Sequence, residues 1–548
     1  MRCPALLLAA ALLPAPSAVR AQTGAAGTLP VKCGFPAVAA ALRGEPDAPG
    51  AFGRTRAAML SRPVLQRSVL VQTASGPVRL HYDTSGTDAP ALLDASYRRI
   101  PGSAHAFADS AAAAIRRTVQ REVVELGYPM PPEDGGEGGG PEFDVYILEL
   151  GALYGETVPE MSLPPAPSAP RYTSFTRVDN DFIFVTPDSN KGVRGLQVTM
   201  AHEFHHAVQL GNYGFRQGEQ FFHEITSVWL EEEVFPDVND YLTYLRSAFG
   251  HFRNPEVPFD SEDFIMYSRG IFGIYAARRH GPGVMRACWE NIRSARALTA
   301  IDDALHAAPG GSGLRVALAE WALWNAFTGP AADSVRYYPE GHLYPAVAKS
   351  WVDMPGSSRA IDGSLEALGS SYYAVRAGAD TLVLIAVNIN LDAALAGSTT
   401  VYPYTFLLNR AQPDAEYRET AAGIYYKFSA PDPGEWYAWD IARNGVGVTM
   451  VPEGTAFPNP FRSGAGRTVA FPVQGSPSAE GELAIYSAGL TKVFAVRRAP
   501  ESWLGMPVFR WDGRNDRGEP AGSGVYVFVL ETEGRTVKGK FVLFQEER

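Results

Sequence analysis

Cysteine is scarce in this sequence, with three among 548 residues. Cys3 falls in an apolar leader, which leaves Cys33 and Cys288 either to form one disulfide or to remain two buried thiols. Excess positive charge is also missing: the net charge is -11, which argues against nucleic acid as a partner. Beyond the leader, no stretch reaches the roughly 18 uninterrupted apolar residues of a membrane-spanning helix, so we expect no membrane span.

The first 21 residues have the pattern of a secretory signal. Arg2 is the charged start, Ala5–Leu13 is the apolar core, and Val19–Ala21 is a small-residue cleavage site before Gln22. We therefore predict a signal peptide at 1–21 and a secreted chain; the alternative is a disordered Ala-rich tail. Residues 22–75, rich in Ala, Pro, Gly and Arg, are predicted to be a propeptide or an N-terminal segment around the catalytic domain.

One short stretch carries the strongest chemical signal. His202, Glu203 and His206 have the spacing HExxH. Residues four apart share one face of an α-helix, so the two imidazoles can bind one metal ion while Glu203 reaches a water on that metal. We predict a catalytic zinc site with histidine ligands and Glu203 as general base. His205 is out of this register and is predicted to be a packed or supporting histidine.

The surroundings of the motif favour a half-buried helix. Val198, Ala201 and Val208 form an apolar stripe, and Gly211 is the predicted stop of the helix. The preceding residues Asp181–Thr186 are predicted to be a strand.

The third metal ligand does not follow in the same segment. The pattern HExxHxxGxxH requires Gly and His where the sequence has Gln209 and Asn212, so a metzincin-like site is excluded. A second helix is predicted at Phe221–Val234, ended by Pro236. It carries candidate glutamates at both of its ends.

Glu224, near the start of that helix, is the candidate for the third ligand. It lies eighteen residues after His206 and begins the string Glu224-Ile-Thr-Ser227. This arrangement resembles the gluzincins, the thermolysin-like and aminopeptidase-like zinc peptidases, and the resemblance implies that Glu224 binds zinc. The competing candidates are Glu231–Glu233, although a run of charge at a helix end is typical of a solvated face.

The same resemblance implies a donor to the oxyanion of the tetrahedral intermediate, supplied by a Tyr or His on a later helix. Tyr267 is the candidate, with a core tyrosine as the alternative reading. His223 and His251 are the other candidates for this role.

A closer resemblance covers roughly residues 33–280. This part of the chain is similar to a family of secreted bacterial metalloproteases in the gluzincin group, and the similarity implies peptide hydrolysis. The strings that carry it are Cys33–Pro36, His81-Tyr82, Gly127–Pro132, Phe143–Tyr146, His202–Gln209, Glu224–Trp229 and Asn239–Leu242.

The residues around the motif predict an α+β, zincin-like catalytic domain at 76–350, because strands precede the zinc helix and helices follow it. Strands are predicted at Val78–Tyr82, Val145–Leu150, Arg171–Val178 and Phe182–Val185. Helices are predicted from Ser103, as N-cap, to Gly127, and at Val238–Phe249, Glu262–His280, Gly283–Ala295, Leu298–Ala307 and Leu314–Phe327.

A Gly-rich loop lies ahead of the second of these strands. Asp134, Glu137 and Asp144 supply the carboxylates that calcium prefers, but the loop lacks any defined calcium-loop spacing. Calcium is therefore a weakly supported expectation, and a plain loop is the alternative.

The C-terminal third alternates apolar and polar residues. It predicts a β-sandwich at 351–452, followed by a second all-β domain at 453–548. Phe457–Phe461, Trp511–Gly513 and Ser523–Tyr526 resemble the immunoglobulin-like repeat of hook-capping proteins and type IX sorting domains. The resemblance implies sorting or anchoring through contact with a secretion machinery or cell surface. The acidic Gln545–Arg548 departs from that pattern and leaves a purely structural β-domain as the alternative.

These observations together predict a secreted zinc metallopeptidase, specifically an endopeptidase that acts on protein or peptide substrates. An aminopeptidase is the alternative enzyme, although no G-x-M-E-N signature precedes the zinc helix. A surface adhesin on a zincin scaffold without turnover is the alternative outside enzymes. Glu203 distinguishes them, because a scaffold does not need the base.

Overall fold

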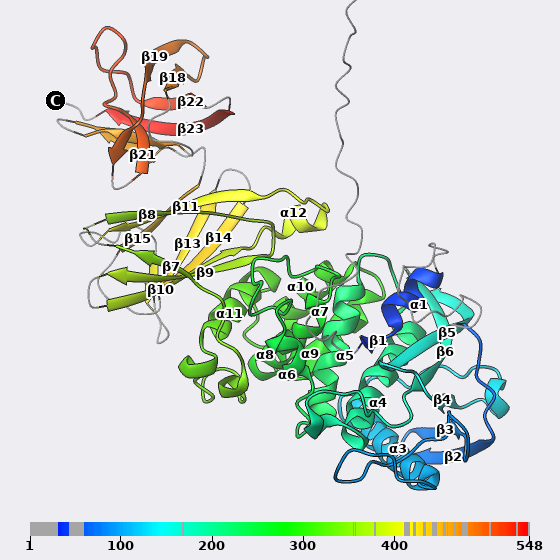
Figure 1. The fold of residues 1–548 in the computed structure, drawn as a ribbon. Coiled ribbons are helices and arrows are strands. Elements are labelled where there is room, and N and C mark those ends of the chain that lie inside the picture. The colour runs from blue at the N-terminus through cyan, green and yellow to red at the C-terminus, as the bar shows by residue number, and fades with distance from the viewer. Residues whose placement is uncertain are drawn as a thin grey trace, which may run out of the picture. The chain divides into compact units, whose positions relative to one another are not determined.

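The computed structural model describes residues 31–42 and 60–545 apart from short internal gaps. The gaps fall at 167–168, 355, 357, 378–379, 410–416, 420–423, 431–433, 441–446, 453–455, 457–458, 465–466, 474–479, 504–505 and 533–534. The described chain forms two compact units. Figure 1 shows its helices and strands. The first comprises the residues up to Arg216 together with Leu230–Asp240, and the second comprises Gln217–Trp229 and the residues from Tyr241 onward. The predicted signal peptide lies outside the described residues.

The first unit is built on a six-stranded mixed sheet. In spatial order its strands are β1 (Val31–Cys33), β5 (Leu153–Ala166), β6 (Ala169–Val178), β4 (Phe143–Ile147), β3 (Gly76–Tyr82) and β2 (Arg67–Thr73). β5 is antiparallel to β6 and β2 to β3, whereas the β1–β5, β6–β4 and β4–β3 pairs are parallel. The predicted strands at Val78–Tyr82 and Arg171–Val178 are confirmed, and the one at Val145–Leu150 overlaps β4. Every residue of β4 is buried, as expected for a central parallel strand.

Two helices of the first unit pack against this sheet and against each other. α3 (Ala104–Val119) continues into a π-helical turn, η1 (Gln120–Glu125), and Gly127 follows in a left-handed conformation, as predicted. Ser103 precedes α3, but its hydroxyl does not cap the helix; it donates to the carbonyl of Ile100. α4 (Val193–Val208) is the predicted zinc helix, and it packs on β5 and β6.

The stop of the zinc helix was predicted one turn too early. α4 continues as a π-helical turn, η4 (Gln209–Tyr213), and ends at Gly214, whose φ of 89° only glycine adopts without strain. Gly211 lies inside this turn. A side chain at Gly211 would collide with the ring of Pro132, so this glycine serves close packing and does not end the helix.

The strand predicted at Phe182–Val185, within Asp181–Thr186, is wrong, because these residues form turns. The carboxylate of Asp179 accepts hydrogen bonds from the backbone N–H groups of Asp181 and Phe182, at 3.0 and 2.7 Å. Such a side-chain acceptor replaces the partner that a strand would supply, and it closes the chain into a turn. Phe182 adopts a φ of 54°, which is incompatible with a strand.

The second unit begins with the first part of α5 (Gln220–Val234), a helix that contributes residues to both units. Six further α-helices of the described second unit follow before the first strand there. They are α6 (Tyr241–Arg246), α7 (Ile265–Ser268), α8 (Gly270–His280), α9 (Gly283–Ile292), α10 (Ala297–Ala307) and α11 (Leu314–Ala326). The predicted helices at Phe221–Val234, Gly283–Ala295, Leu298–Ala307 and Leu314–Phe327 are confirmed to within a few residues at each end.

Two predicted helices are shorter or broken. The helix expected at Val238–Phe249 is only α6, because Asn239 adopts a left-handed φ of 46° and the chain becomes helical after it. The helix expected at Glu262–His280 is broken at Arg269 into α7 and α8. Side-chain periodicity continues through both breaks, which is why the pattern alone did not show them.

The remaining strands of the second unit form two pairs of sheets. The strands of residues 350–452 form a six-stranded sheet, β12-β13-β14-β10-β9-β7, and a three-stranded sheet, β15-β11-β8. Their bounds are β7 Ser350–Asp353, β8 Ser358–Leu365, β9 Ser370–Ala377, β10 Asp380–Asn388, β11 Tyr402–Asn409, β12 Tyr417–Glu419, β13 Ile424–Ala430, β14 Gly434–Asp440 and β15 Gly447–Pro452, with a short helix, α12, at Leu391–Leu395. Buried side chains from both sheets, among them Val375 and Phe406, form one core.

The strands of residues 461–545 form the second pair, a five-stranded sheet, β16-β23-β22-β18-β19, and a three-stranded sheet, β17-β21-β20. Their bounds are β16 Phe461–Ser463, β17 Val469–Pro472, β18 Gly481–Ser487, β19 Lys492–Arg498, β20 Glu501–Trp503, β21 Met506–Trp511, β22 Gly524–Thr532 and β23 Arg535–Gln545. Phe471 and Trp511 from one sheet and Phe528 and Phe541 from the other share a separate core. Trp511 belongs to the string that suggested a sorting-type domain.

The chain is therefore multidomain, with a mixed α and β part followed by strands in several sheets. The zincin-like and immunoglobulin-like assignments stay predictions. In the part of the chain that the structure describes, no helix combines the length and the apolar character of a membrane span.

Candidate metal centre

Helix α4 brings His202 and His206 together. They lie one turn apart on the same face, and both are buried. Their Nε2 atoms are 3.1 Å apart. Two nitrogens that are each ~2.05 Å from a tetrahedral zinc ion lie about 3.3 Å apart, so this separation suits two ligands of one ion.

The other ring nitrogen of each histidine is held by an acceptor. Nδ1 of His202 lies 2.7 Å from Oε1 of Glu231, and Nδ1 of His206 lies 2.8 Å from Oε1 of Gln209. An amide or carboxylate oxygen can only accept, so Nδ1 carries the proton and Nε2 is left with its lone pair. Such partners orient metal-binding histidines and raise their basicity.

Glu231 corrects a prediction, because it is not part of a solvated face. It is 2% exposed, and its second oxygen lies 2.8 Å from Nζ of Lys32. Lys32 in turn lies 2.5 Å from Asp240. Burial lowers the pKa of Lys32, but Asp240 and Glu231 together outweigh burial and raise it, so the ammonium stays charged. A buried chain therefore runs from Asp240 through Lys32 and Glu231 to His202.

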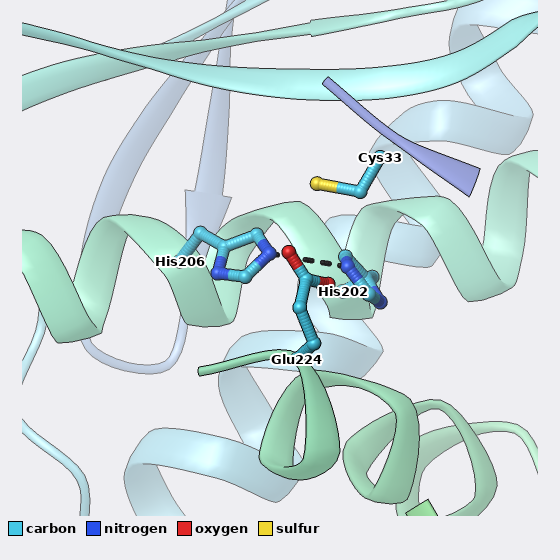
Figure 2. Close-up of side chains that lie close together, drawn as sticks. All are labelled: Cys33, His202, His206 and Glu224. Carbon is cyan, nitrogen blue, oxygen red and sulfur yellow. Dashed lines mark hydrogen bonds between the residues drawn. The ribbon is translucent and has the colours of Figure 1, made fainter. Parts of the chain in front are cut away.

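Glu224 reaches the two histidines through the geometry of α5. It precedes Glu231 by seven residues, which is close to two full helical turns, so both side chains leave the same face of the helix. Glu224 is fully buried. Its carboxylate, the imidazoles of His202 and His206, and the thiol of Cys33 each place one ligand atom within 4.8 Å of the others (Figure 2). The structure thus brings all three predicted ligands together.

Glu203 is fully buried on α4, next to His202. Its Oε2 lies 2.8 Å from the hydroxyl of Thr157 on β5, whereas Oε1 accepts no hydrogen bond within the described residues. Burial raises the pKa of Glu203, while His206, His202 and the neighbouring thiol of Cys33 act in the opposite direction. A fixed carboxylate with one oxygen available is suited to accept a proton.

Cys33 is the member of the group that the sequence analysis did not assign to the site. It ends β1, and it forms no disulfide with Cys288; both are buried thiols. The backbone N–H of Phe35 points at its Sγ at 3.3 Å. The string Cys33–Pro36 was noted only as part of a resemblance, and the HExxH spacing carries no information about a cysteine 169 residues earlier.

The remaining histidine of the motif faces elsewhere. Nδ1 of His205 lies 3.1 Å from Glu122 on η1, and the His205 ring meets Tyr128 edge to face. Burial raises the pKa of Glu122 well above its ordinary value, despite the opposing effect of His202. His205 is thus a packed histidine, as its register in the motif predicted.

The candidates for an oxyanion donor lie in the second unit. Tyr267 is buried on α7, and its ring packs against Tyr244 and Phe264. His223 precedes Glu224 on α5, and its ring meets Trp289 edge to face. The ring of His251 stacks on a tryptophan and its Nε2 lies 3.0 Å from Asn325. The role of Tyr267 stays a prediction.

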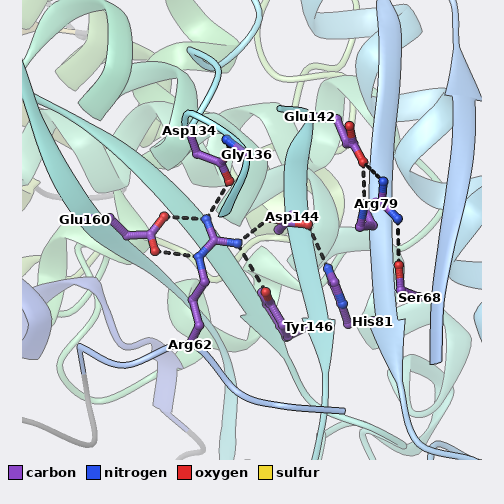
Figure 3. Close-up of polar contacts among 10 residues, drawn as sticks. All are labelled: Arg62, Ser68, Arg79, His81, Asp134, Gly136, Glu142, Asp144, Tyr146 and Glu160. Atoms are coloured by element: carbon purple, nitrogen blue, oxygen red, sulfur yellow. Dashed lines mark hydrogen bonds and ion pairs between the residues drawn. The ribbon is translucent and has the colours of Figure 1, made fainter. Parts of the chain in front are cut away.

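The carboxylates predicted to hold calcium have a different partner. Asp134 and Asp144 both pair with the guanidinium of Arg62, which Glu160 also contacts (Figure 3). Arg62 thereby supplies the positive charge that calcium would supply. Glu137, the third predicted ligand, lies in a short 3-10 turn, η2 (Glu137–Gly139), and has no part in this cluster.

Comparisons with known proteins find little. No family model matches the sequence, and no curated protein matches it. One similar solved structure is dimeric latent PorU from Porphyromonas gingivalis, with 17% identity over 26% of this chain and 18% of that chain, and a TM-score of 0.16. Another is PorZ, an essential bacterial surface component of the type-IX secretion system of the same organism, with 10% identity over 33% and 37% and a TM-score of 0.14. This chain spans less than half of either neighbour, and similarity this low carries no inference.

Proposed function

We propose that this chain is a secreted zinc metallopeptidase of the gluzincin type that cleaves protein or peptide substrates internally. His202, His206 and Glu224 are the metal ligands, and Glu203 is the general base. The observation that supports the proposal is the convergence of three buried ligand atoms beside a buried carboxylate on the same helix. Two histidines and a glutamate are the protein ligands of one established class of catalytic zinc site.

The donor set and its surroundings fit zinc. Both histidines offer Nε2 because Glu231 and Gln209 hold Nδ1. When bound there, zinc lowers the pKa of a water and polarises the carbonyl of the scissile peptide. The protein contributes the orientation of the ligands and a site closed to bulk solvent.

Glu203 moves the proton. Thr157 holds its Oε2, and Oε1 is the atom that takes the proton of the attacking water. The same oxygen then passes this proton to the departing amine. Tyr267 is the proposed donor to the oxyanion, and loss of such a donor costs about 10²–10³ in kcat.

Replacing the base separates metal binding from catalysis. Glu203→Gln keeps the size of the side chain and its bond to Thr157, so zinc stoichiometry and folding should stay unchanged. Peptide hydrolysis should fall by ~10²–10⁴-fold, in kcat more than in KM, because the base acts in the transition state. His202→Ala is the comparison variant, and it should lose both zinc and activity.

Two results would contradict the proposal. Equal hydrolysis by wild type and Glu203→Gln would remove the base from the mechanism. Zinc bound to the wild type, with no hydrolysis of a peptide library by the wild type or by the Cys33 variants described below, would favour a surface adhesin on a zincin scaffold.

Export is a separate part of the proposal. The leader at 1–21 predicts a mature chain that begins at or near Gln22. The domain at 453–548 is proposed to act in sorting or anchoring at the cell surface. Terminal sequencing of secreted protein checks the first point, and retention of a chain truncated after residue 452 inside the cell envelope would support the second.

A further inference from the structure

We propose that Cys33 is the fourth ligand of the metal bound by His202, His206 and Glu224, and that the segment Val31–Pro36 thereby holds the peptidase in a latent state. This inference rests on the proposed function, and it concerns regulation of the same site. A catalytic zinc ion keeps one coordination position for water or substrate, whereas a structural zinc ion has four protein ligands. With Cys33 the set is four, so the site is closed.

The thiol lies where the fourth ligand must be. Its Sγ is within 4.8 Å of the ligand atoms of His202, His206 and Glu224. Ligand atoms of a tetrahedral zinc ion with sulfur at ~2.3 Å and nitrogen at ~2.05 Å lie roughly 3.3–3.6 Å apart, so small side-chain movements complete the geometry. In Figure 2 the side chain of Cys33 comes from above the two histidines, and that of Glu224 reaches them from below. The thiol is also a hydrogen-bond partner of the Glu203 carboxylate, the proposed base.

The strand that carries Cys33 occupies the edge of the sheet beside the site. β1 pairs in parallel with β5, with Cys33 opposite Gly155. A side chain at Gly155 would lie 2.9 Å from Cγ of Glu203, so this register position is next to the base. Without β1, β5 is an edge strand, and an edge strand beside a catalytic group is where an extended peptide adds to a sheet. β1 thus excludes substrate as well as water.

The neighbours of Cys33 in the segment Val31–Pro36 contact the predicted histidine ligands or the residues that hold them. Lys32 bonds Glu231, which orients His202. The ring of Phe35 stacks on His206, with centroids 4.6 Å apart. Gly34 lies so close to the next strand that a Cβ there would be 2.7 Å from Cβ of Glu156. Each residue from 32 to 35 is therefore fitted to the site, which a chance position of one cysteine does not explain.

The part of the chain that can be removed to open the site ends before Arg62. Arg62 is paired with Asp134, Asp144 and Glu160, and β2 is a strand of the main sheet. Removal of residues up to 75 would take away both, whereas removal of the segment before Arg62 leaves the sheet from β2 to β5 intact. Opening breaks one metal–sulfur bond, forms one metal–water bond, and adds one proton from solvent to the thiolate. No oxidant or reductant is required.

The test uses the full exported chain with its metal replaced by cobalt(II). A thiolate ligand gives a sulfur-to-cobalt charge-transfer band in the near ultraviolet, and zinc absorption fine structure gives a sulfur neighbour at ~2.3 Å. Both signals should be present in the wild type and in Cys288→Ser, and absent in Cys33→Ser and Cys33→Ala at unchanged metal stoichiometry. Cys288 is the matched control, because it is the other buried thiol.

Activity provides the second readout. If the open form is a minor state of 0.1–10%, peptide hydrolysis should rise roughly 10- to 1,000-fold in Cys33→Ser and Cys33→Ala, and it should not change in Cys288→Ser. Both Cys33 variants are measured in case one of them misfolds, and circular dichroism checks that each is folded. Glu203→Gln added to Cys33→Ser should abolish the gain.

The outcomes separate this inference from the proposed function. Cobalt bound at one equivalent without the sulfur signal in the wild type overturns Cys33 as a ligand, yet leaves the peptidase proposal standing. A sulfur signal that depends on Cys33, with hydrolysis unchanged in both Cys33 variants, overturns latency. Failure of the wild type and of all variants to bind metal overturns the proposed function itself.

Discussion

Two clusters of charged and polar side chains in the described structure differ in the source of their positive charge. In the cluster around Arg62, three carboxylates surround a guanidinium that belongs to the chain, and Tyr146 adds a fourth contact at 3.1 Å (Figure 3). In the cluster around His202, two imidazole lone pairs, a carboxylate and a thiol converge on one point (Figure 2).

The difference distinguishes a cluster with its own cation from a candidate binding site for one. Carboxylates that already enclose a cation have their charge compensated and gain little from another ion. Converging lone pairs repel one another until a cation arrives, and the groups behind them, Glu231 and Gln209, are placed to hold the histidines in that arrangement. An acidic composition, which first suggested calcium near Asp134, is therefore a poorer guide to a metal site than the direction of the lone pairs.

The largest expected effect is on the converging cluster. Glu224→Ala removes one ligand, and zinc affinity should fall by more than the ~100-fold typical of losing a supporting partner. Equilibrium dialysis against a zinc indicator measures it. Glu232→Ala on the same helix is the control, with affinity expected to stay unchanged. Zinc retained in Glu224→Ala would mean that the carboxylate is not a ligand.

The next largest effect is expected on the stability of the Arg62 cluster, whose cation belongs to the chain. Arg62→Ala leaves Asp134, Asp144 and Glu160 without their counter-charge, and because the Arg62 side chain is only 13% exposed, the free energy of unfolding should drop by about 3–5 kcal/mol. Denaturant unfolding of the purified chain measures the change. Zinc binding should persist in the folded protein.

A surface pair provides the control for this prediction. Arg98 also pairs with an aspartate, Asp94, but its side chain is 77% exposed. Arg98→Ala should therefore change the free energy of unfolding by no more than ~1 kcal/mol. Equal losses in the two variants would show that the Arg62 cluster is no more than a solvated pair.

A smaller effect is expected behind the histidines. Glu231→Gln keeps a hydrogen-bond acceptor for His202 but removes the charge, and zinc affinity should fall by about 10–100-fold. The same titration that is used for Glu224→Ala measures it. This expectation replaces the earlier one that Glu231 lies on a solvated face. An unchanged affinity would show that its bond to His202 does not tune the ligand.

The smallest expected effect is calcium binding to the Arg62 cluster after its own cation has been removed. Once Arg62 is removed, Asp134, Asp144 and Glu160 become oxygen ligands without a cation, so calcium should stabilise Arg62→Ala. At a tenfold excess over its Kd the gain is about 1.4 kcal/mol, or a rise in Tm of a few degrees. Calcium should leave the Tm of the wild type unchanged. A similar shift in both proteins would place the calcium elsewhere.

Much of the candidate site could be predicted from local spacing. His202, Glu203 and His206 lie on one helix because four residues make close to one turn, and Glu224 was found because its helix and its separation from His206 match a known arrangement. The side chains that support them could not be found this way. Thr157 comes from β5, and its bond to Glu203 depends on the packing of α4 on the sheet. Gln209 lies three residues after His206, but the motif does not predict that it holds Nδ1 of His206.

The wrong predictions of secondary structure also arose because a local pattern does not show the contacts of the folded chain. The apolar run at residues 182–185 predicted a strand, but the carboxylate of Asp179 accepts hydrogen bonds from the local N–H groups and closes a turn. Periodicity also predicted one helix across Arg269, which is broken into two. The spacing of apolar residues indicates which side chains are buried, but it does not indicate where the backbone changes direction.

The sequence by itself determined the helix that carries His202, Glu203 and His206 and the alternation of residues in the strands of the last third, because each depends on residues that are close in the chain. Only the tertiary structure decided that Cys33 joins the histidines, that Lys32 and Glu231 lie behind His202, and that Arg62 pairs with Asp134 and Asp144. These contacts connect residues that are tens to hundreds of positions apart. They depend on strand order and on the pairing of β1 with β5, which no local pattern specifies.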